Sequence, residues 1–168
     1  MLTSVQITPE FAVSRALTSA DFAEAAARGF KSILNVRPDG ESANQLSSAE
    51  ARIAADAAGL SYAHVPVQKH DLFSNEAVTE AQRTLAHMSG PILAYCASGQ
   101  RAAILWAASN ARTEPVASVL AALKAADFNL DFLRDDLDAQ ADRARWSNSS
   151  DATSAAGEAS DGSGLAAA

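Results

Sequence analysis

The chain has 168 residues, 48% of them hydrophobic, which is enough for one domain with a substantial core. Its formal net charge of −7 argues against a nucleic-acid or anionic-membrane partner, because phosphate surfaces are bound by clustered Lys and Arg. The single cysteine excludes an internal disulfide, and no signal peptide or membrane-spanning run is recognisable, so a cytoplasmic location is expected.

Strand patterns and helix patterns alternate along the chain, with short polar connections between them. The predicted elements are, in chain order, one or two edge strands over 4–13, a helix over 19–28, a strand over 30–36, a helix over 49–58, a strand over 60–67, a helix over 75–88, a strand over 91–95, and helices over 101–111, 114–126 and 131–145. Thr18, Ser47 or Ser48, and Thr113 are the expected N-caps.

This alternation is typical of βαβ units around a mostly parallel sheet. We therefore expect an α/β protein with three layers, in which helices flank a central sheet. The strand over 91–95 is apolar throughout, as expected for a strand that is buried on both faces.

The composition changes near the C-terminus. Residues 147–168 are mainly Ser, Ala, Gly and Asp, and such a segment buries too little apolar surface to offset the entropy of ordering. The expected organisation is a catalytic domain over 1–145 and a disordered tail over 146–168.

The candidate reactive group is the thiol of Cys96, at the carboxyl end of the predicted strand over 91–95. The loop that follows is Ala97, Ser98, Gly99, Gln100 and Arg101. Ligands of open α/β sheets bind at this edge, and the loop N–H groups together with the N-terminus of the next helix can hold an oxyanion. The same positive environment favours the thiolate, so Cys96 and Arg101 are the predicted catalytic pair.

Two other segments can reach the same edge of the sheet. Arg37 and Asp39 follow the strand over 30–36 and are pocket candidates, although Asp39 also fits an ordinary turn. Asp71 and its neighbour His70, in the loop before the helix over 75–88, are further candidates, although they also fit an ordinary solvated loop. The three histidines show no metal-ligand spacing, so neither a metal nor another cofactor is expected.

The loop from Cys96 to Arg101 is similar to the Cys-X-X-Gly-X-Arg loop of rhodanese-type sulfurtransferases. Over about residues 7–112 the chain resembles the phosphatase-like domain of beta-lactamase hydrolase-like proteins. That resemblance lies in Asn-Val-Arg-Pro-Asp-Gly-Glu at 35–41, in the run at 58–67, and in Gly-Pro-Ile-Leu-Ala-Tyr-Cys at 90–96. It implies the fold of cysteine-dependent tyrosine phosphatases with a loop one residue shorter, in a family described both as phosphatase-like and as sulfur transferases. Phosphatases of this fold place a general acid in the loop where Asp71 stands, so the resemblance makes Asp71 the predicted general acid.

Two positions depart from the family pattern, which usually has Arg where Ala97 stands and Ser where Ala102 stands. The serine hydroxyl helps the thiolate leave a phosphoenzyme, so its absence favours sulfur transfer. The main expectation is therefore a sulfurtransferase that takes sulfur from a small anionic or sulfane-sulfur substrate, carries it as a persulfide on Cys96 and passes it to a thiol acceptor. The alternatives are a phosphatase with a phospho-Cys96 intermediate and a non-catalytic domain that senses an anion or binds a partner.

Overall fold

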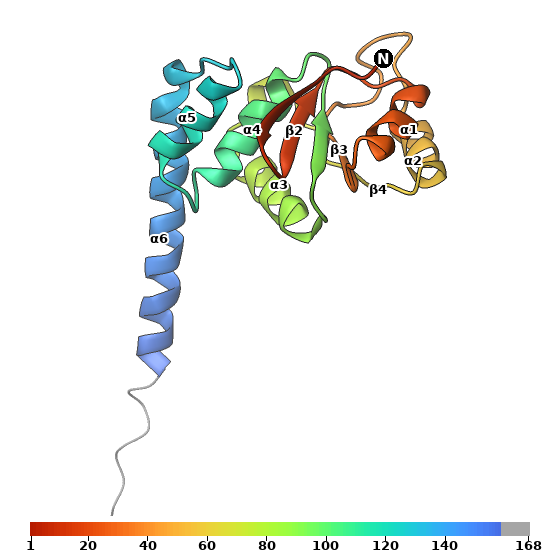
Figure 1. The fold of residues 1–168 in the computed structure, drawn as a ribbon. Helices are drawn as coiled ribbons and strands as arrows, with labels where there is room; N and C mark the ends of the chain where they lie inside the picture. Colours follow the sequence, from red (N-terminus) through yellow and green to blue (C-terminus); the bar gives the residue numbers. More distant parts are fainter. Residues whose placement is uncertain (159–168) are drawn as a thin grey trace, which may run out of the picture.

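A five-stranded sheet forms the centre of the computed structural model, which describes residues 1–158 (Figure 1). Across the sheet the strands are β1 (Ser4–Thr8), β2 (Phe11–Ser14), β5 (Ile92–Tyr95), β3 (Ser32–Asn35) and β4 (Ser61–His64). β1 pairs with β2 in the antiparallel sense, and every other neighbouring pair is parallel. This confirms the expected mostly parallel α/β sheet. The expected edge position is right for β1 but wrong for β2, which is fully buried between β1 and β5.

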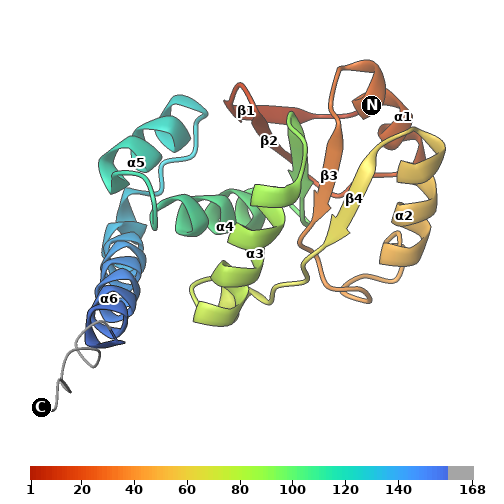
Figure 2. The same cartoon turned by 90° about the horizontal axis from the view of Figure 1, so that it is seen from below.

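Helices cover both faces of the sheet, which gives the expected three layers (Figure 2). One face carries α1 (Ser19–Ala27) and α2 (Ser48–Ala57), and the other carries α3 (Asn75–His87) and α4 (Gln100–Asn110). The chain then continues into α5 (Val116–Ala125) and α6 (Arg134–Glu158), with two short 3₁₀ turns at η1 (Lys69–Asp71) and η2 (Asp131–Leu133).

Successive residues of a strand point to opposite faces, and this alternation divides the core in two. Leu93 and Tyr95 pack in the cluster that α1 and α2 cover. Ala94 and Cys96 pack in the cluster on the face of α3 and α4. The side chains of Tyr95 and Cys96 are neighbours in sequence, but they therefore serve opposite faces of the sheet.

The helix starts follow the expected capping chemistry with one exception. Thr18 with Asp21, and Ser47 with Glu50, form capping boxes that satisfy backbone N–H groups in the first turns of α1 and α2. α5 does not begin after Thr113, because the backbone N–H groups of Thr113 and Glu114 both bond to the carbonyl of Asn110 and continue the turn that ends α4. Pro115 is the observed N-cap of α5.

α6 continues well past the boundary that composition suggested. It runs through residues 147–158, which were expected to belong to a disordered tail, and it extends away from the sheet in Figure 1. Residues 159–168 of that expected tail lie outside the described part of the chain. Within the described part, no helix combines the length and the apolar character needed to cross a membrane.

Candidate active site

The loop from Cys96 to Arg101 joins the end of β5 directly to the start of α4. Gly99 is the N-cap of α4 and has a φ of 96°, a left-handed conformation that disfavours residues with a side chain. A Cβ atom at Gly99 would also lie 3.3 Å from the carbonyl oxygen of Ser14 on β2. The sharp turn and the close approach of β2 both depend on glycine at this position.

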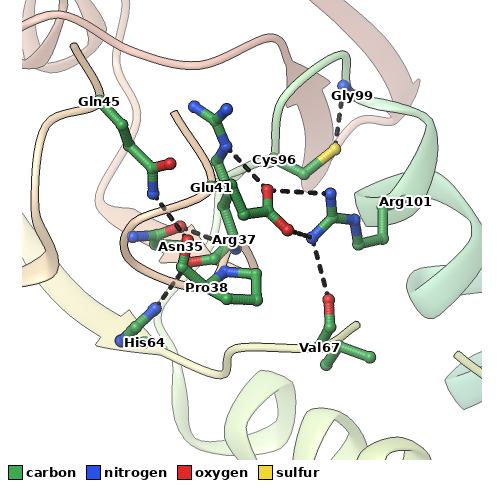
Figure 3. Close-up of polar contacts among 10 residues, drawn as sticks. All are labelled: Asn35, Arg37, Pro38, Glu41, Gln45, His64, Val67, Cys96, Gly99 and Arg101. Atoms are coloured by element: carbon green, nitrogen blue, oxygen red, sulfur yellow. Dashed lines mark hydrogen bonds and ion pairs between the residues drawn. The ribbon is translucent and has the colours of Figure 1, made fainter. Parts of the chain in front are cut away.

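The turn brings a backbone donor onto the sulfur. The N–H of Gly99 lies 3.1 Å from Sγ of Cys96 and points at it, so it can stabilise negative charge there (Figure 3). Only 1% of Cys96 is exposed, whereas Ala97, Ser98 and Gln100 are exposed around it. The loop is fixed from the other side by the N–H of Ala16, which donates to the carbonyl of Ala97 at 3.3 Å.

Arg101 lies in the first turn of α4 with 5% of its surface exposed. Its Nη1 and Nη2 donate to the two carboxylate oxygens of Glu41 at 3.0 and 3.2 Å, and Nη1 also donates to the carbonyl of Val67 at 3.0 Å (Figure 3). Its Nε is buried and has no hydrogen-bond partner in the described part of the chain. A cationic N–H without an acceptor, beside a cysteine loop, is available to an incoming oxyanion.

The carboxylate of Glu41 connects Arg101 to Arg37. This carboxylate accepts from Arg101 and also from Nε of Arg37 at 3.0 Å (Figure 3). The hydrogen bond from Arg101, followed by that from Arg37, holds the pKa of Glu41 below its ordinary value against the opposing effect of burial. Glu41 therefore stays ionised and keeps the guanidinium of Arg101 in one orientation.

A cavity of about 340 Å³ opens beside the sulfur. Its wall consists of the cysteine loop and of residues from η1, from the turn after it and from α4: Lys69, Leu72, Cys96, Ala97, Ser98, Gln100, Arg101 and Ile104. The cation of Lys69 and the apolar side chains of Leu72 and Ile104 make this cavity suited to an anion that carries an apolar group.

The structure separates the other predicted site residues from this cavity. Asp71 lines a different cavity, of about 350 Å³, together with His64 and Ser74. The side chains of Asp71 and His70 are 50% and 80% exposed, and they lie 3.4 Å apart as an ion pair if His70 is protonated. The expected general acid is thus on the loop beside the cysteine cavity without lining it.

Arg37 and Asp39 do lie at the carboxyl edge of the sheet, but neither lines the cysteine cavity. Arg37 acts through Glu41, as described above. Asp39 accepts a hydrogen bond of 2.8 Å from the backbone N–H of Ser48, at the start of α2, which agrees with the ordinary structural role also considered for it. Within the described residues, no group of three His, Cys, Asp or Glu side chains is arranged to hold a metal ion.

Sequence reasoning missed Glu41 and Lys69. Glu41 ends the run Asn-Val-Arg-Pro-Asp-Gly-Glu, and it carried a usable signal. An arginine in the first turn of a helix is disfavoured by the helix dipole and, once buried, requires a carboxylate partner. An acidic residue just beyond a neighbouring parallel strand is the natural source of that partner. Lys69 in its polar loop carried no comparable signal.

Residues 4–113 match the family model described as "Beta-lactamase hydrolase-like protein, phosphatase-like domain". A beta-lactamase hydrolase-like protein of Agrobacterium fabrum is 36% identical over 113 residues, which are 64% of this chain and 25% of that protein. One from Xylella fastidiosa is 39% identical over 111 residues, which are 63% of this chain and 24% of that protein. The chain thus matches about a quarter of the length of these curated relatives.

Solved structures agree with this assignment. A putative phosphatase from Neisseria meningitidis superimposes with a TM-score of 0.70 and 30% identity, covering 81% of this chain and 96% of the other. Tk-PTP superimposes with a TM-score of 0.64 at 16% identity, covering 86% and 97% of the two chains. The core catalytic domain of a PP-IP phosphatase from S. cerevisiae, solved in complex with citrate, gives a TM-score of 0.52 at 16% identity over 76% of each chain. The last two show the fold alone, and that fold is the one expected.

Proposed function

The chain belongs to the family of the phosphatase-like domain of beta-lactamase hydrolase-like proteins, and on this premise we propose that it is a hydrolase that cleaves phosphomonoesters with Cys96 as the nucleophile. The observation that carries the proposal is the unpartnered Nε of Arg101, which is buried in the wall of the same cavity as Cys96. A cationic donor held beside a thiol in this way supports the binding of a phosphoryl oxygen next to the attacking sulfur.

The proposed reaction has two steps. The thiolate of Cys96 attacks phosphorus, the bond from phosphorus to the ester oxygen breaks, and the leaving alcohol takes up a proton. Water then attacks the phospho-Cys96 intermediate, which releases phosphate and restores the thiolate. Arg101 stabilises the phosphoryl oxygens throughout, and the N–H of Gly99 stabilises the sulfur when it carries negative charge.

The first step needs a proton donor for the leaving alcohol. Asp71 remains the candidate because η1, on which it lies, also contributes Lys69 to the cysteine cavity. Asp71 itself faces the neighbouring cavity, so this role requires η1 to move when substrate binds. An aryl phosphate, whose leaving group needs little protonation, is therefore the appropriate first substrate.

Sulfur transfer, the main expectation from sequence, is the second candidate, although the comparisons favour the phosphatase alternative. Two observations support sulfur transfer. Ala102, 2% exposed directly after Arg101, supplies no hydroxyl to help the thiolate leave a phosphoenzyme. Asp71 lies outside the cysteine cavity, and passing on a persulfide sulfur needs no general acid for an alcohol.

One experiment separates the two reactions. The same preparation is assayed with an aryl phosphate and, separately, with thiosulfate and cyanide, and Cys96→Ser serves as the blank for both. The phosphatase proposal predicts aryl phosphate turnover well above the blank and greater than sulfur transfer. If sulfur transfer is the only activity found, the second candidate replaces the phosphatase proposal. Turnover that survives in Cys96→Ser would contradict both, and no turnover in either assay would leave the non-catalytic binding domain.

A further inference from the structure

A second cavity, of about 170 Å³, lies at the carboxyl edge of the sheet, on the face that α1 and α2 cover. We call it the Tyr95 cavity. Its wall consists of Tyr95 at the end of β5, the segment after β2 and the loop after β3: Ala16, Leu17, Thr18, Arg37, Ser42, Asn44, Gln45, Leu46 and Tyr95. None of these residues lines the cysteine cavity, so the two cavities are separate.

The hydroxyl of Tyr95 is buried and makes no hydrogen bond of ordinary length within the described residues. Tyr95 as a whole is 3% exposed. The neighbouring hydroxyl of Tyr62 is already engaged with Asn35 and Ser48, each at 3.0 Å. Burial, and after it the charge and the hydrogen-bonding influence of the nearby Tyr62 hydroxyl, raises the pKa of Tyr95 far above its ordinary value. The hydroxyl therefore keeps its proton and can donate a hydrogen bond.

Gln45, which also lines this cavity, has a buried acceptor without a partner among the described residues. Its Nε2 donates to the carbonyl of Pro38 at 2.7 Å, and its Oε1 is buried with no partner in the described part of the chain. Turning the amide over would place Oε1 against the carbonyl of Pro38, with two acceptors in contact, so the orientation is fixed. The lone pairs of Oε1 therefore require a ligand that can donate a hydrogen bond.

Arg37 supplies a positive charge to the Tyr95 cavity. Its side chain is 12% exposed, and only its Nε is engaged by Glu41, while Figure 3 shows the two terminal nitrogens turned away from that carboxylate. Glu41 is shared with Arg101, so two guanidinium groups have this one carboxylate between them. The other acid on this loop, Asp39, accepts a hydrogen bond from the backbone N–H of Ser48 at the start of α2. A planar pair of N–H donors thus remains for an anion.

We propose that the Tyr95 cavity is a binding site for a small oxyanion that still carries a proton, of the class of hydrogen phosphate or the monoanion of a phosphomonoester. Arg37 and Tyr95 donate to its charged oxygens, and its P–OH group donates to Oε1 of Gln45. Sulfate has the same shape but no proton at neutral pH, so its oxygens would face the lone pairs of Gln45 without a hydrogen bond. The site therefore selects phosphate over sulfate.

The test observes Tyr95 directly. The chain has two tyrosines, so protein labelled with 3-fluorotyrosine gives two fluorine NMR signals, and Tyr95→Phe assigns them. Inorganic phosphate and sulfate are titrated separately at constant ionic strength and neutral pH. We expect a saturable shift of the Tyr95 signal with phosphate and at least roughly tenfold weaker binding of sulfate, since one unpaired buried polar contact costs about that factor.

Gln45→Leu removes the acceptor at nearly constant volume and should abolish most of the selectivity between the two anions. Gln6→Leu, an amide removed from the exposed strand β1, should leave it unchanged. A cavity that holds only water would give no saturable shift, and a site for any oxyanion would give equal shifts with both. Phosphate bound only at the cysteine loop would shift the signal equally in wild type and Gln45→Leu. Each of these three results overturns the proposal, and none of them bears on turnover by Cys96.

Discussion

The guanidinium of Arg101 bonds to Glu41 and to the carbonyl of Val67 through its terminal nitrogens, and this makes its shape matter as much as its charge. Glu41 takes both terminal nitrogens in a planar, two-pronged contact, and Nε is left for the substrate. A lysine has a single ammonium group and cannot hold Glu41 and a phosphoryl oxygen in the same plane. Positive charge alone is therefore not sufficient at this position.

Arg101→Lys should accordingly lose activity by roughly a hundredfold or more, the size expected when one preorganised donor to the reacting oxyanion is removed. The fold should survive, because the ammonium can still pair with Glu41. The measurement is kcat/KM on an aryl phosphate, with circular dichroism as the check on folding. Lys31→Arg, an exchange of the same two residue types on the exposed surface, is the control. Equal activity in Arg101→Lys would show that the forked geometry is not used.

Glu41 gives a prediction about pH. Its pKa in the folded chain lies below the ordinary value of 4.5, because Arg101 and then Arg37 donate to it. A depressed carboxyl pKa contributes stability that is complete above the unfolded value and is lost as the pH falls through the folded one. Glu41→Gln should lower the free energy of unfolding by about 1–3 kcal/mol near neutral pH, since it leaves the buried Arg101 without its counter-charge.

The difference between wild type and Glu41→Gln should stay constant from neutral pH down to about 4.5 and then shrink as the wild-type carboxyl takes up its proton. Urea unfolding at several pH values measures it. Glu76→Gln, in the exposed first turn of α3, controls for the loss of a carboxylate. A difference that does not change at acid pH would mean that the charge of Glu41 is not the source of its stabilising effect on Arg101.

At the scale of the element, the critical feature is the junction of β5, the cysteine loop and α4. Gly99 and Gly59, the latter just after α2, both have a positive φ, of 96° and 75°, but of the two only Gly99 is crowded. A Cβ at Gly99 would lie 3.3 Å from the backbone oxygen of Ser14 on β2, whereas a Cβ at Gly59 would meet nothing within 4 Å. Alanine variants at these two glycines therefore separate two effects. One is the loss of stability from a left-handed backbone, and the other is the effect of shifting the cysteine loop.

Gly59→Ala should destabilise the chain by about 1–2 kcal/mol, the ordinary cost of a left-handed residue with a Cβ, and leave kcat/KM nearly unchanged. Gly99→Ala should cost more than this and should also lower kcat/KM, because the N–H that contacts Cys96 must shift with the loop. Thermal unfolding and aryl phosphate kinetics on both variants provide the comparison. Equal effects on activity would show that the position of this N–H is not important for the reaction.

The elements were largely predictable from sequence because each carries a local signal. Capping boxes at Thr18 and Ser47 and the apolar strand before Cys96 act over a few residues and appear where they were expected. The position of β2 was not predictable, because pairing with β5 brings together strands that are far apart in sequence. The same limit applies to the site. The loop from Cys96 to Arg101 is local and was found, whereas the pairing of Arg101 with Glu41 crosses sixty positions and was missed.

For the whole molecule, the main question is where the folded unit ends. Composition placed the boundary near Trp146, but α6 continues to Glu158 without a break. The contacts that hold α6 against the domain lie in the first turns of this helix. Leu137 is fully buried, and Gln140, 2% exposed, donates to the carbonyl of Phe73 and accepts from Arg112. An amphipathic helix is stabilised mainly by the face that it buries, so its first turns carry the docking energy.

A chain that ends at Trp146 should therefore keep its melting temperature within a few degrees and its activity nearly unchanged, although α6 is helical beyond that point. Leu137→Ala in the full chain should cost about 2–5 kcal/mol, because it removes a side chain with 0% exposure from the core on the α4 side. Differential scanning calorimetry on the truncated chain, on Leu137→Ala and on the full chain measures both effects. If the truncated chain melted as low as Leu137→Ala, the later turns of α6 would have to contribute as much to the fold as its buried first turns, and the domain would extend to the end of the helix.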